Sequence, residues 1–239
     1  MTNQVIAIKE LYKKYQIGKF DLNSFLSKKT KEILALENIN FNINKFDRIA
    51  IVGLNGSGKS TLLKIISRVT YPTLGEVRVD GKVSSVLEAG AGFHPELTGL
   101  ENIYLSGAIL GMSRKLVKHK IDEIINFSKI EDYINTPVKR YSTGMLIKLA
   151  FSISAFLDGD ILIFDEIMSV ADETFKKEAT SHILKQVGKT IIFVSHDDRN
   201  IKDICNRAVL LDKGKLILDG GVEEVLKEYR ALSNKNISS

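Results

Sequence analysis

The chain has 239 residues, of which 44% are hydrophobic and 26% are charged, so it is long and apolar enough to bury one substantial core. No run reaches the ~18 apolar residues of a transmembrane helix, no signal peptide is apparent, and the one cysteine, Cys205, excludes an intrachain disulfide. The net charge of +5 is too small to demand a nucleic acid or a membrane as partner.

Strands and helices alternate along the predicted chain. Apolar and β-branched runs predict strands at 4–9, 38–44, 48–52, 76–79, 83–87, 161–164 and 190–194. Helical spacing of apolar residues predicts helices at 61–69, 101–110, 115–127, from about 142, from about 172, after 194 and at 222–232. Residues 10–36 are predicted as a variable segment, and Lys213-Gly214 as a hairpin turn. The alternation predicts an α/β fold with a mostly parallel sheet, into which the helices of about 97–155 are inserted as a lobe.

The segment 53–60, Gly-Leu-Asn-Gly-Ser-Gly-Lys-Ser, matches the phosphate-binding P-loop at every fixed position. It lies between a predicted strand and a predicted helix, where backbone N–H groups and the helix dipole favour an anion. Lys59 can reach the β- and γ-phosphates, and the Ser60 hydroxyl can ligate Mg²⁺. The predicted nucleotide-binding residues are Gly53, Leu54, Asn55, Gly56, Ser57, Gly58, Lys59, Ser60 and Thr61. The sequence therefore predicts that a nucleoside triphosphate binds here.

Two carboxylates follow the predicted strand 161–164. Asp165 is expected to hold Mg²⁺ through water, and Glu166 to orient or deprotonate the attacking water. His196 follows the next predicted strand, where it could contact the γ-phosphate as a polar clamp. A solvated acidic strand end and a structural histidine are the alternatives, and the P-loop in the same chain favours the catalytic interpretation.

The segment 139–145, Lys-Arg-Tyr-Ser-Thr-Gly-Met, opens a predicted helix shortly before these carboxylates. With the P-loop, it resembles the signature of the nucleotide-binding subunits of ABC transporters, usually Leu-Ser-Gly-Gly-Gln. Ser142 and Gly144 match this pattern, and the other three positions depart from it. A serine N-cap with N–H groups at a helix start makes a second anion site.

The resemblance implies an ATP-hydrolysing P-loop NTPase core with a mostly parallel sheet, a small antiparallel β lobe and an inserted helical lobe. It also implies a homodimer in which Ser142 and Gly144 of one subunit close on ATP held by the other. Asp172 lies where the family's D-loop would contact the partner's site. Tyr15 lies where the family's aromatic residue stacks on adenine; Tyr12 is its rival, and either tyrosine could instead belong to the core.

The family's usual glutamine between P-loop and helical lobe is missing. Glu88 could replace it, since a carboxylate could meet the metal through water, or it could be a surface charge. Residues 90–99, followed by Glu101-Asn-Ile, are similar to the ABC branch that exports teichoic acids, O-antigens and capsules. This resemblance implies ATP and Mg²⁺ as cofactors, a separate membrane permease, a glycan or glycolipid cargo handled mainly by that permease, and no nucleic acid.

The same resemblance places the protein at the cytoplasmic face of the membrane, held there by the permease. Some members of the branch add a C-terminal carbohydrate-binding domain. We expect a single ABC ATPase domain over 1–239, with no room for such a domain, so that the choice of glycan lies elsewhere.

For each of two segments, the sequence allows both an external contact and packing within the chain. Residues 21–31 could form a helix whose Leu22, Phe25 and Leu26 face either lipid headgroups or the protein's own sheet. Residues 93–101 lie where the family docks its permease, so Phe93 and His94 are candidate contacts; an ordered loop with a partly buried Phe93 is the alternative.

Three rival functions share the P-loop. An ABC subunit of a small-molecule importer or drug exporter is disfavoured by the missing glutamine and the variant signature. A soluble ABC ATPase acting on DNA or ribosomes typically carries a coiled-coil insertion or two ATPase units, and no sustained heptad is visible. A kinase or GTPase is disfavoured by the signature-like helix.

Overall fold

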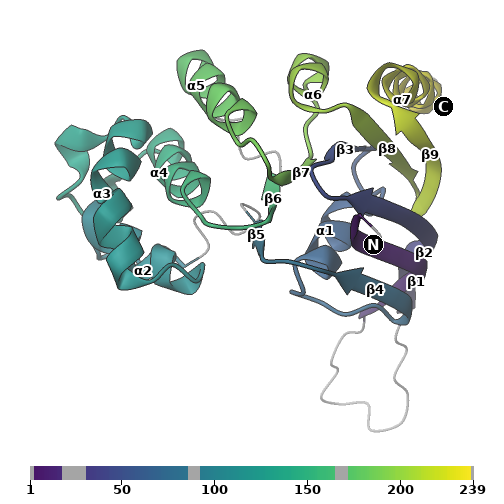
Figure 1. Ribbon diagram of the computed structural model, residues 1–239, viewed down its shortest axis with the longest axis horizontal. Coiled ribbons are helices and arrows are strands. Elements are labelled where there is room, and N and C mark those ends of the chain that lie inside the picture. Colours follow the sequence, from purple (N-terminus) through teal and green to yellow (C-terminus); the bar gives the residue numbers. More distant parts are fainter. Residues whose placement is uncertain (1–2, 18–30, 86–91, 165–171, 238–239) are drawn as a thin grey trace, which may run out of the picture. The chain divides into compact units, whose positions relative to one another are not determined.

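The structure is a computed structural model that describes residues 3–17, 31–85, 92–164 and 172–237. The chain divides into two compact units (Figure 1), residues 1–80 with 205–239 and residues 81–204. We refer to them as the first and the second unit. Among the described residues, no helix combines the length and the hydropathy needed to cross a bilayer.

The first unit contains an antiparallel sheet in the order β2-β1-β4 (Figure 1). Its strands are β1 (Gln4–Ile17), β2 (Lys31–Asn44) and β4 (Leu74–Val79). Alternating side chains of β1 and β2, among them Ile6, Ile8 and Ile43, are fully or almost fully buried and face the core.

The prediction that residues 10–36 form a variable segment is wrong for both of its ends. β1 continues to Ile17 and β2 begins at Lys31, and the two remain paired there. The pairing register shifts between Ile8 and Leu11, and Glu10 has a positive φ of 46°. This irregularity breaks the period of two on which the strand prediction rests. Beyond it, buried and exposed apolar residues are mixed, with Leu36 fully buried and Leu34 exposed, so hydropathy does not mark these segments as strands.

The first unit also contains the strands that flank the P-loop. β3 (Arg48–Val52) pairs in parallel with β8 (Arg207–Asp212), which pairs antiparallel with β9 (Lys215–Gly221). The helices of this unit are α1 (Lys59–Ile66) and α7 (Val222–Ile237). Lys213 and Gly214, at φ 46° and 80°, form the predicted two-residue turn between β8 and β9.

The second unit contains three short parallel strands in the order β5-β6-β7. These are β5 (Val83–Ser85), β6 (Ile161–Phe164) and β7 (Thr190–Phe193). β6 and β7 are buried throughout, as expected of apolar strands in a parallel sheet. The helices of this unit are α2 (Gly99–Ile109), α3 (Arg114–Ser128), α4 (Thr143–Ala155), α5 (Glu173–Leu184) and α6 (Asp198–Ile204), with 3₁₀ turns at Glu131–Tyr133 and Val138–Arg140.

Helices α2, α3 and α4 pack around an apolar core of their own (Figure 1). Tyr141, which precedes α4, lies in this core, and its hydroxyl donates a hydrogen bond to the Tyr133 carbonyl at 2.7 Å. A Cβ added at Gly99 would lie 2.3 Å from that hydroxyl, so the tyrosine occupies the space beside α2 that a side chain would need. The start of α4 is therefore fixed by a buried aromatic residue.

Candidate functional site

The P-loop (53–60) bends sharply between β3 and α1. Gly53 has a φ of 155°, and a Cβ there would lie 2.2 Å from the Leu211 carbonyl oxygen. Gly58 has a φ of 107°, and its Cβ would lie 2.7 Å from Leu36 Cδ2 and 2.8 Å from the Ala35 carbonyl oxygen. Both positions require glycine because of conformation and close approach together. The glycines let the backbone wrap tightly enough to form an anion cradle.

Helix α1 begins without a capping side chain. Gly58 is its N-cap, no acidic residue lies in its first turn, and its first intrahelical bond runs from Leu62 N to Gly58 O at 2.9 Å. The first N–H groups of a helix have no intrahelical acceptor, and they carry the positive end of its dipole. This end of α1 is therefore suited to a phosphate.

Lys59 is buried, and its ammonium lies over the loop. Its Nζ donates hydrogen bonds to the Gly53 carbonyl at 2.7 Å and to the Leu54 carbonyl at 3.2 Å. The hydroxyl of Ser57, also buried, has no hydrogen-bond partner among the described residues. Ser60 is exposed beside the ammonium in the first turn of α1.

These donors fit a triphosphate. A glycine cradle, an uncapped helix start and a buried ammonium together supply N–H groups and positive charge where phosphate oxygens need them. The exposed hydroxyl of Ser60 fits a Mg²⁺ ligand. The other predicted ligand, Asp165, and the predicted base, Glu166, lie outside the described residues.

Ser142 is the N-cap of α4, and its Oγ accepts a hydrogen bond from Met145 N at 3.3 Å. The nearest atom that a Cβ at Gly144 would meet is Ser142 Oγ, at 3.9 Å. Gly144 does not have a positive φ either. Neither backbone conformation nor crowding within the described chain requires glycine here, unlike at Gly53 and Gly58.

The sequence profile of the ABC transporter family matches residues 36–169. The chain belongs to this family. Its sequence is 41% identical over 204 residues to the O-antigen export system ATP-binding protein RfbB of Klebsiella pneumoniae, covering 84% of this chain and 83% of that protein. It is 42% identical over 216 residues to the teichoic acids export ATP-binding protein TagH of Enterococcus faecalis, covering 90% and 48%. The family predicted from the motifs is confirmed.

Some of these ABC relatives are much longer than the chain. The chain matches 46% of the length of RfbB of Myxococcus xanthus, at 44% identity. Among solved structures, a dimeric ATP-binding cassette bound to ADP and phosphate has a TM-score of 0.75 at 24% identity, over 91% of this chain and 98% of that one. This likeness confirms the predicted fold class, the ABC ATPase fold.

The predicted D-loop residue of this ABC protein, Asp172, is bound within its own chain. It is the N-cap of α5, accepts a hydrogen bond from Phe175 N at 2.9 Å and forms an ion pair with Lys148 of α4. The hydrogen bond from Lys148, followed by that from Phe175 N, lowers the pKa of Asp172. Sequence reasoning missed Lys148, although a lysine inside an otherwise apolar helix is a signal for a partner of opposite charge.

The two other predicted contacts of the nucleotide lie in different units. Tyr15, on β1, is half-buried, and the Lys13 ammonium lies 5.0 Å from its ring centroid. Lys13 also donates to Thr70 Oγ1 at 3.0 Å and to the Tyr71 carbonyl at 2.8 Å. The rival, Tyr12, is half-buried opposite Leu74. His196, in the second unit, is exposed in the segment that joins β7 to α6.

The loop 92–98 is organised by one side chain that sequence reasoning did not single out. Asn102, fully buried in α2, accepts a hydrogen bond from His94 N at 2.8 Å. Its Nδ2 donates to the carbonyls of His94, Leu97 and Thr98 at 3.2, 3.0 and 2.9 Å. Phe93, half-buried, packs against the core of α2–α4, and His94 is exposed. Hydrogen bonds from buried Asn102 therefore hold the backbone of the loop, and His94 on its outer side is exposed to solvent.

Asn102→Ala is expected to destabilise the protein by about 2–4 kcal/mol, since it removes four hydrogen bonds of a buried side chain. The three carbonyls keep backbone donors, and the His94 N–H loses its acceptor. Chemical denaturation measures the loss. Asn42→Ala, at an exposed position of β2, is the matched control and is expected to change stability by less than about 0.5 kcal/mol. Equal stabilities of the two variants would contradict this role of Asn102.

A groove of about 390 Å³ adjoins this loop and the start of α4. It is lined by Phe93, Pro95, Val138, Lys139, Tyr141, Thr143, Leu146, Ile147 and Ala150. Its surface is mostly apolar, and Lys139 at its rim forms an ion pair with Glu96 at 2.6 Å. The hydrogen bond from Lys139 lowers the pKa of Glu96 below its ordinary value.

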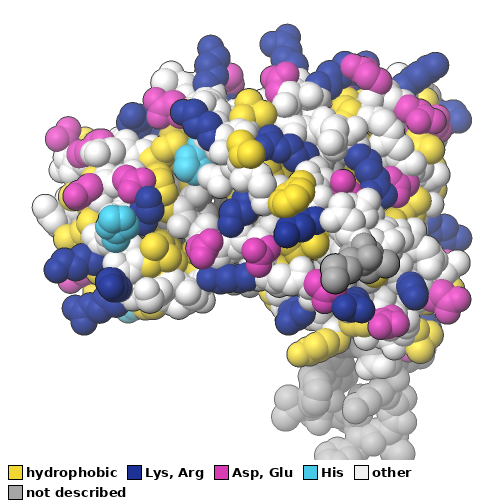
Figure 2. Space-filling view, viewed as in Figure 1, with side chains coloured by type: hydrophobic (Ala, Val, Ile, Leu, Met, Phe, Trp, Pro, Cys, Tyr) yellow, Lys and Arg dark blue, Asp and Glu magenta, His cyan; other side chains and the backbone are white. Residues whose placement is uncertain are grey.

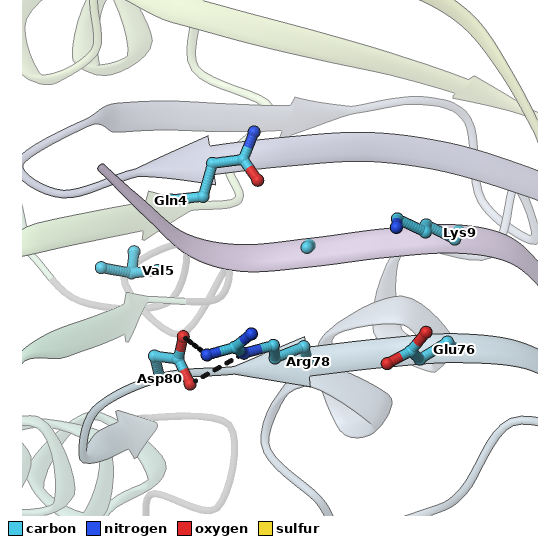
Figure 3. Close-up of a pocket in the computed structure, with 7 residues that line it drawn as sticks. Gln4, Val5, Lys9, Glu76, Arg78 and Asp80 are labelled. Carbon is cyan, nitrogen blue, oxygen red and sulfur yellow. Dashed lines mark hydrogen bonds and ion pairs between the residues drawn. The ribbon is translucent and has the colours of Figure 1, made fainter. Parts of the chain in front are cut away.

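A second hollow, of about 240 Å³, lies on β1 and β4 (Figure 3) and contains no predicted site residue. Its charged side chains have both signs, and Arg78 and Asp80 form an ion pair at 3.0 Å. On the face seen in Figure 2, basic and acidic side chains are likewise interspersed. Glu88 and residues 21–30 lie outside the described residues, so both interpretations of each remain predictions.

Proposed function

We propose that the chain is the ATP-hydrolysing subunit that powers export of a polysaccharide or lipid-linked glycan through a separate transmembrane permease. The observation that carries this proposal is the 41% identity to an O-antigen export ATP-binding protein over 83% of that protein's length. Teichoic acid export proteins at 42% identity support the same class of cargo. Residues 90–99 with Glu101-Asn-Ile, together with the variant signature, resemble the same branch.

The proposed reaction is attack of water on the γ-phosphorus of ATP, with cleavage of its bond to the ADP oxygen. Glu166 takes the proton of the water, and His196 steadies the γ-phosphate. The P-loop N–H groups and Lys59 hold the phosphate oxygens. Mg²⁺, held by Ser60 and Asp165, would neutralise charge on the β- and γ-phosphates. The products are ADP and phosphate.

We also propose that the working form is a homodimer with ATP between the subunits. Support comes from the start of α4, where Ser142 is exposed and a Cβ on Gly144 would meet no atom nearer than Ser142 Oγ at 3.9 Å. A glycine that its own chain does not require fits a surface that a second molecule approaches closely. The dimeric state of a structurally similar cassette supports the same arrangement.

Gly144→Ala is expected to raise the stability of the protein and to lower its rate of ATP hydrolysis. Alanine in the first turn of α4 should raise the free energy of unfolding by about 0.5–1 kcal/mol, since the position is helical and uncrowded. ATP hydrolysis should fall by about tenfold, the effect of an overpacked contact of about 1–3 kcal/mol. Denaturation and a steady-state phosphate assay measure the two quantities.

Gly221→Ala provides the control, because Gly221 also has open space around it and no positive φ. Its ATP hydrolysis should be unchanged. Full activity of Gly144→Ala, together with ATP-dependent dimers in size-exclusion chromatography, would show that Gly144 does not face a partner subunit.

We propose that the permease docks on the groove beside the loop 92–98, which would hold the protein at the cytoplasmic face of the membrane. An apolar floor with a charged pair at its rim suits a short helix of a partner protein. Hydrogen bonds from the buried Asn102 side chain hold the backbone of this loop. A stable Phe93 substitution, Phe93→Ser, should therefore lose permease-stimulated hydrolysis and keep the basal rate; loss of both rates together would argue against docking here.

A further inference from the structure

The turn between β8 and β9 contacts the P-loop and β2 through Gly214. Gly214 N donates a hydrogen bond to the Ser57 carbonyl at 3.0 Å, and the Gly214 carbonyl accepts one from Glu37 N at 2.8 Å. Ser57 lies before the N-cap of α1, whose first helical bond uses the carbonyl of Gly58. The Ser57 carbonyl is thus satisfied from the turn instead of from the helix.

The backbones of the turn, the P-loop and β2 approach one another closely at Gly214 and Gly58. A Cβ on Gly214 would lie 2.8 Å from the Ala35 carbonyl oxygen and 3.4 Å from Leu36 Cα. A Cβ on Gly58 would lie 2.8 Å from the same Ala35 oxygen and 3.7 Å from Gly214 Cα. Gly214 has a φ of 80°, so its conformation and its surroundings both exclude a side chain.

The hydrogen bond from Gly214 has a consequence on the other side of the P-loop. In a trans peptide, the C=O and N–H groups point in opposite directions. The structure has no cis peptide bond among the described residues. Since the Ser57 carbonyl points to the turn, the N–H of Gly58 points away from it. A change at the turn would rotate this peptide and redirect that N–H group.

We propose that Gly214 is a positioning residue of the phosphate site, which holds the Ser57–Gly58 peptide so that the Gly58 N–H faces the bound phosphates. The proposal rests on the ATP-binding function proposed above. The Glu37–Lys215 ion pair, at 3.2 Å, adds a second link between the turn and β2. Both of its side chains are more than one third exposed, so its contribution is small.

The test compares Gly214→Ala with Gly188→Ala. Gly188 has a similar φ of 76°, and a Cβ there would meet nothing within 4 Å, so it reproduces the backbone strain alone. Affinities for ATP and for inorganic tripolyphosphate are measured by calorimetry, and amide hydrogen exchange is followed at residues 57–61. Gly214→Ala should weaken both ligands by about tenfold or more. Gly188→Ala should change them by less than about twofold.

Hydrogen exchange makes the result independent of nucleotide chemistry. Faster exchange at 57–61 in Gly214→Ala, with exchange in α7 unchanged, is expected from a local rotation of the P-loop. Equal affinities and equal exchange in the two variants would overturn the proposal. A wild-type protein that binds neither ligand would overturn the proposed function, while the exchange data would still decide the role of Gly214.

A second variant covers the case in which Gly214→Ala does not fold. Glu37→Gln combined with Lys215→Met removes the exposed ion pair and leaves the turn itself unchanged. It should weaken tripolyphosphate binding by about twofold to threefold and speed exchange at Ser57. No change in either quantity would contradict a contribution of this second link to positioning the P-loop.

Discussion

Glu166→Gln is expected to bind ATP normally and to hydrolyse it at least about 100-fold more slowly, because glutamine keeps the shape of the side chain but cannot accept the proton of water. The neighbouring Asp165 is expected to bind Mg²⁺ and would be unaffected. Equilibrium ATP binding and single-turnover phosphate release measure the two effects separately. Binding should remain within about twofold of wild type, since the substitution does not touch the P-loop.

Glu173→Gln is the matched control for this experiment. Glu173 lies in the first turn of α5 and is largely exposed in an ion pair with Lys176. Its substitution should leave turnover unchanged. Wild-type rates in Glu166→Gln would show that another group activates the water, and the assignment of Glu166 would then be wrong.

Lys59→Ala is expected to act one step earlier and to weaken ATP binding itself by at least about 100-fold, since a charge-assisted contact in a buried site is lost. Lys59 is buried, and its ammonium is already held by two carbonyls of the loop. Alanine removes the only predicted side-chain cation of the cradle. Titration of the variant with ATP measures the loss.

Ser67→Ala tests whether this loss is specific to the ammonium. The Ser67 hydroxyl lies at the other end of α1 and has no hydrogen-bond partner among the described residues, so its removal should leave affinity within about twofold and should not reduce stability. Normal ATP binding by Lys59→Ala would contradict the P-loop assignment. An equal loss in both variants would point to a general disturbance of α1 instead of the missing charge.

The fold class could be predicted because its signals are local. The buried run 48–52, the glycines after it and the helical spacing after Lys59 are contiguous, and the structure places them in β3, the P-loop and α1. The second half of β1 and the first half of β2 could not be predicted. Their pairing crosses register shifts, and their apolar residues are buried in some places and exposed in others, so they show no regular alternation in hydropathy.

In the candidate site, too, the features that are local in sequence could be predicted and the long-range contacts could not. Residues 53–61 are adjacent in sequence, so their spacing alone suggested a phosphate site. Lys148 and Asp172 are far apart in sequence and meet because α4 packs near the start of α5. Asn102 and Gly214 form hydrogen bonds with backbone groups of other segments, and the type of residue at these positions does not predict such bonds. Contacts of this kind become visible only in three dimensions.

The central claim is that ATP hydrolysis by this chain powers glycan export, and recovery of its partners tests it most directly. Tagged Glu166→Gln would be purified from native membranes with ATP, and the proteins and lipids bound to it would be identified by mass spectrometry. We expect a multi-spanning permease together with a glycolipid. Recovery of ribosomal or DNA-binding proteins without a permease would contradict the transport function and leave only the ATPase.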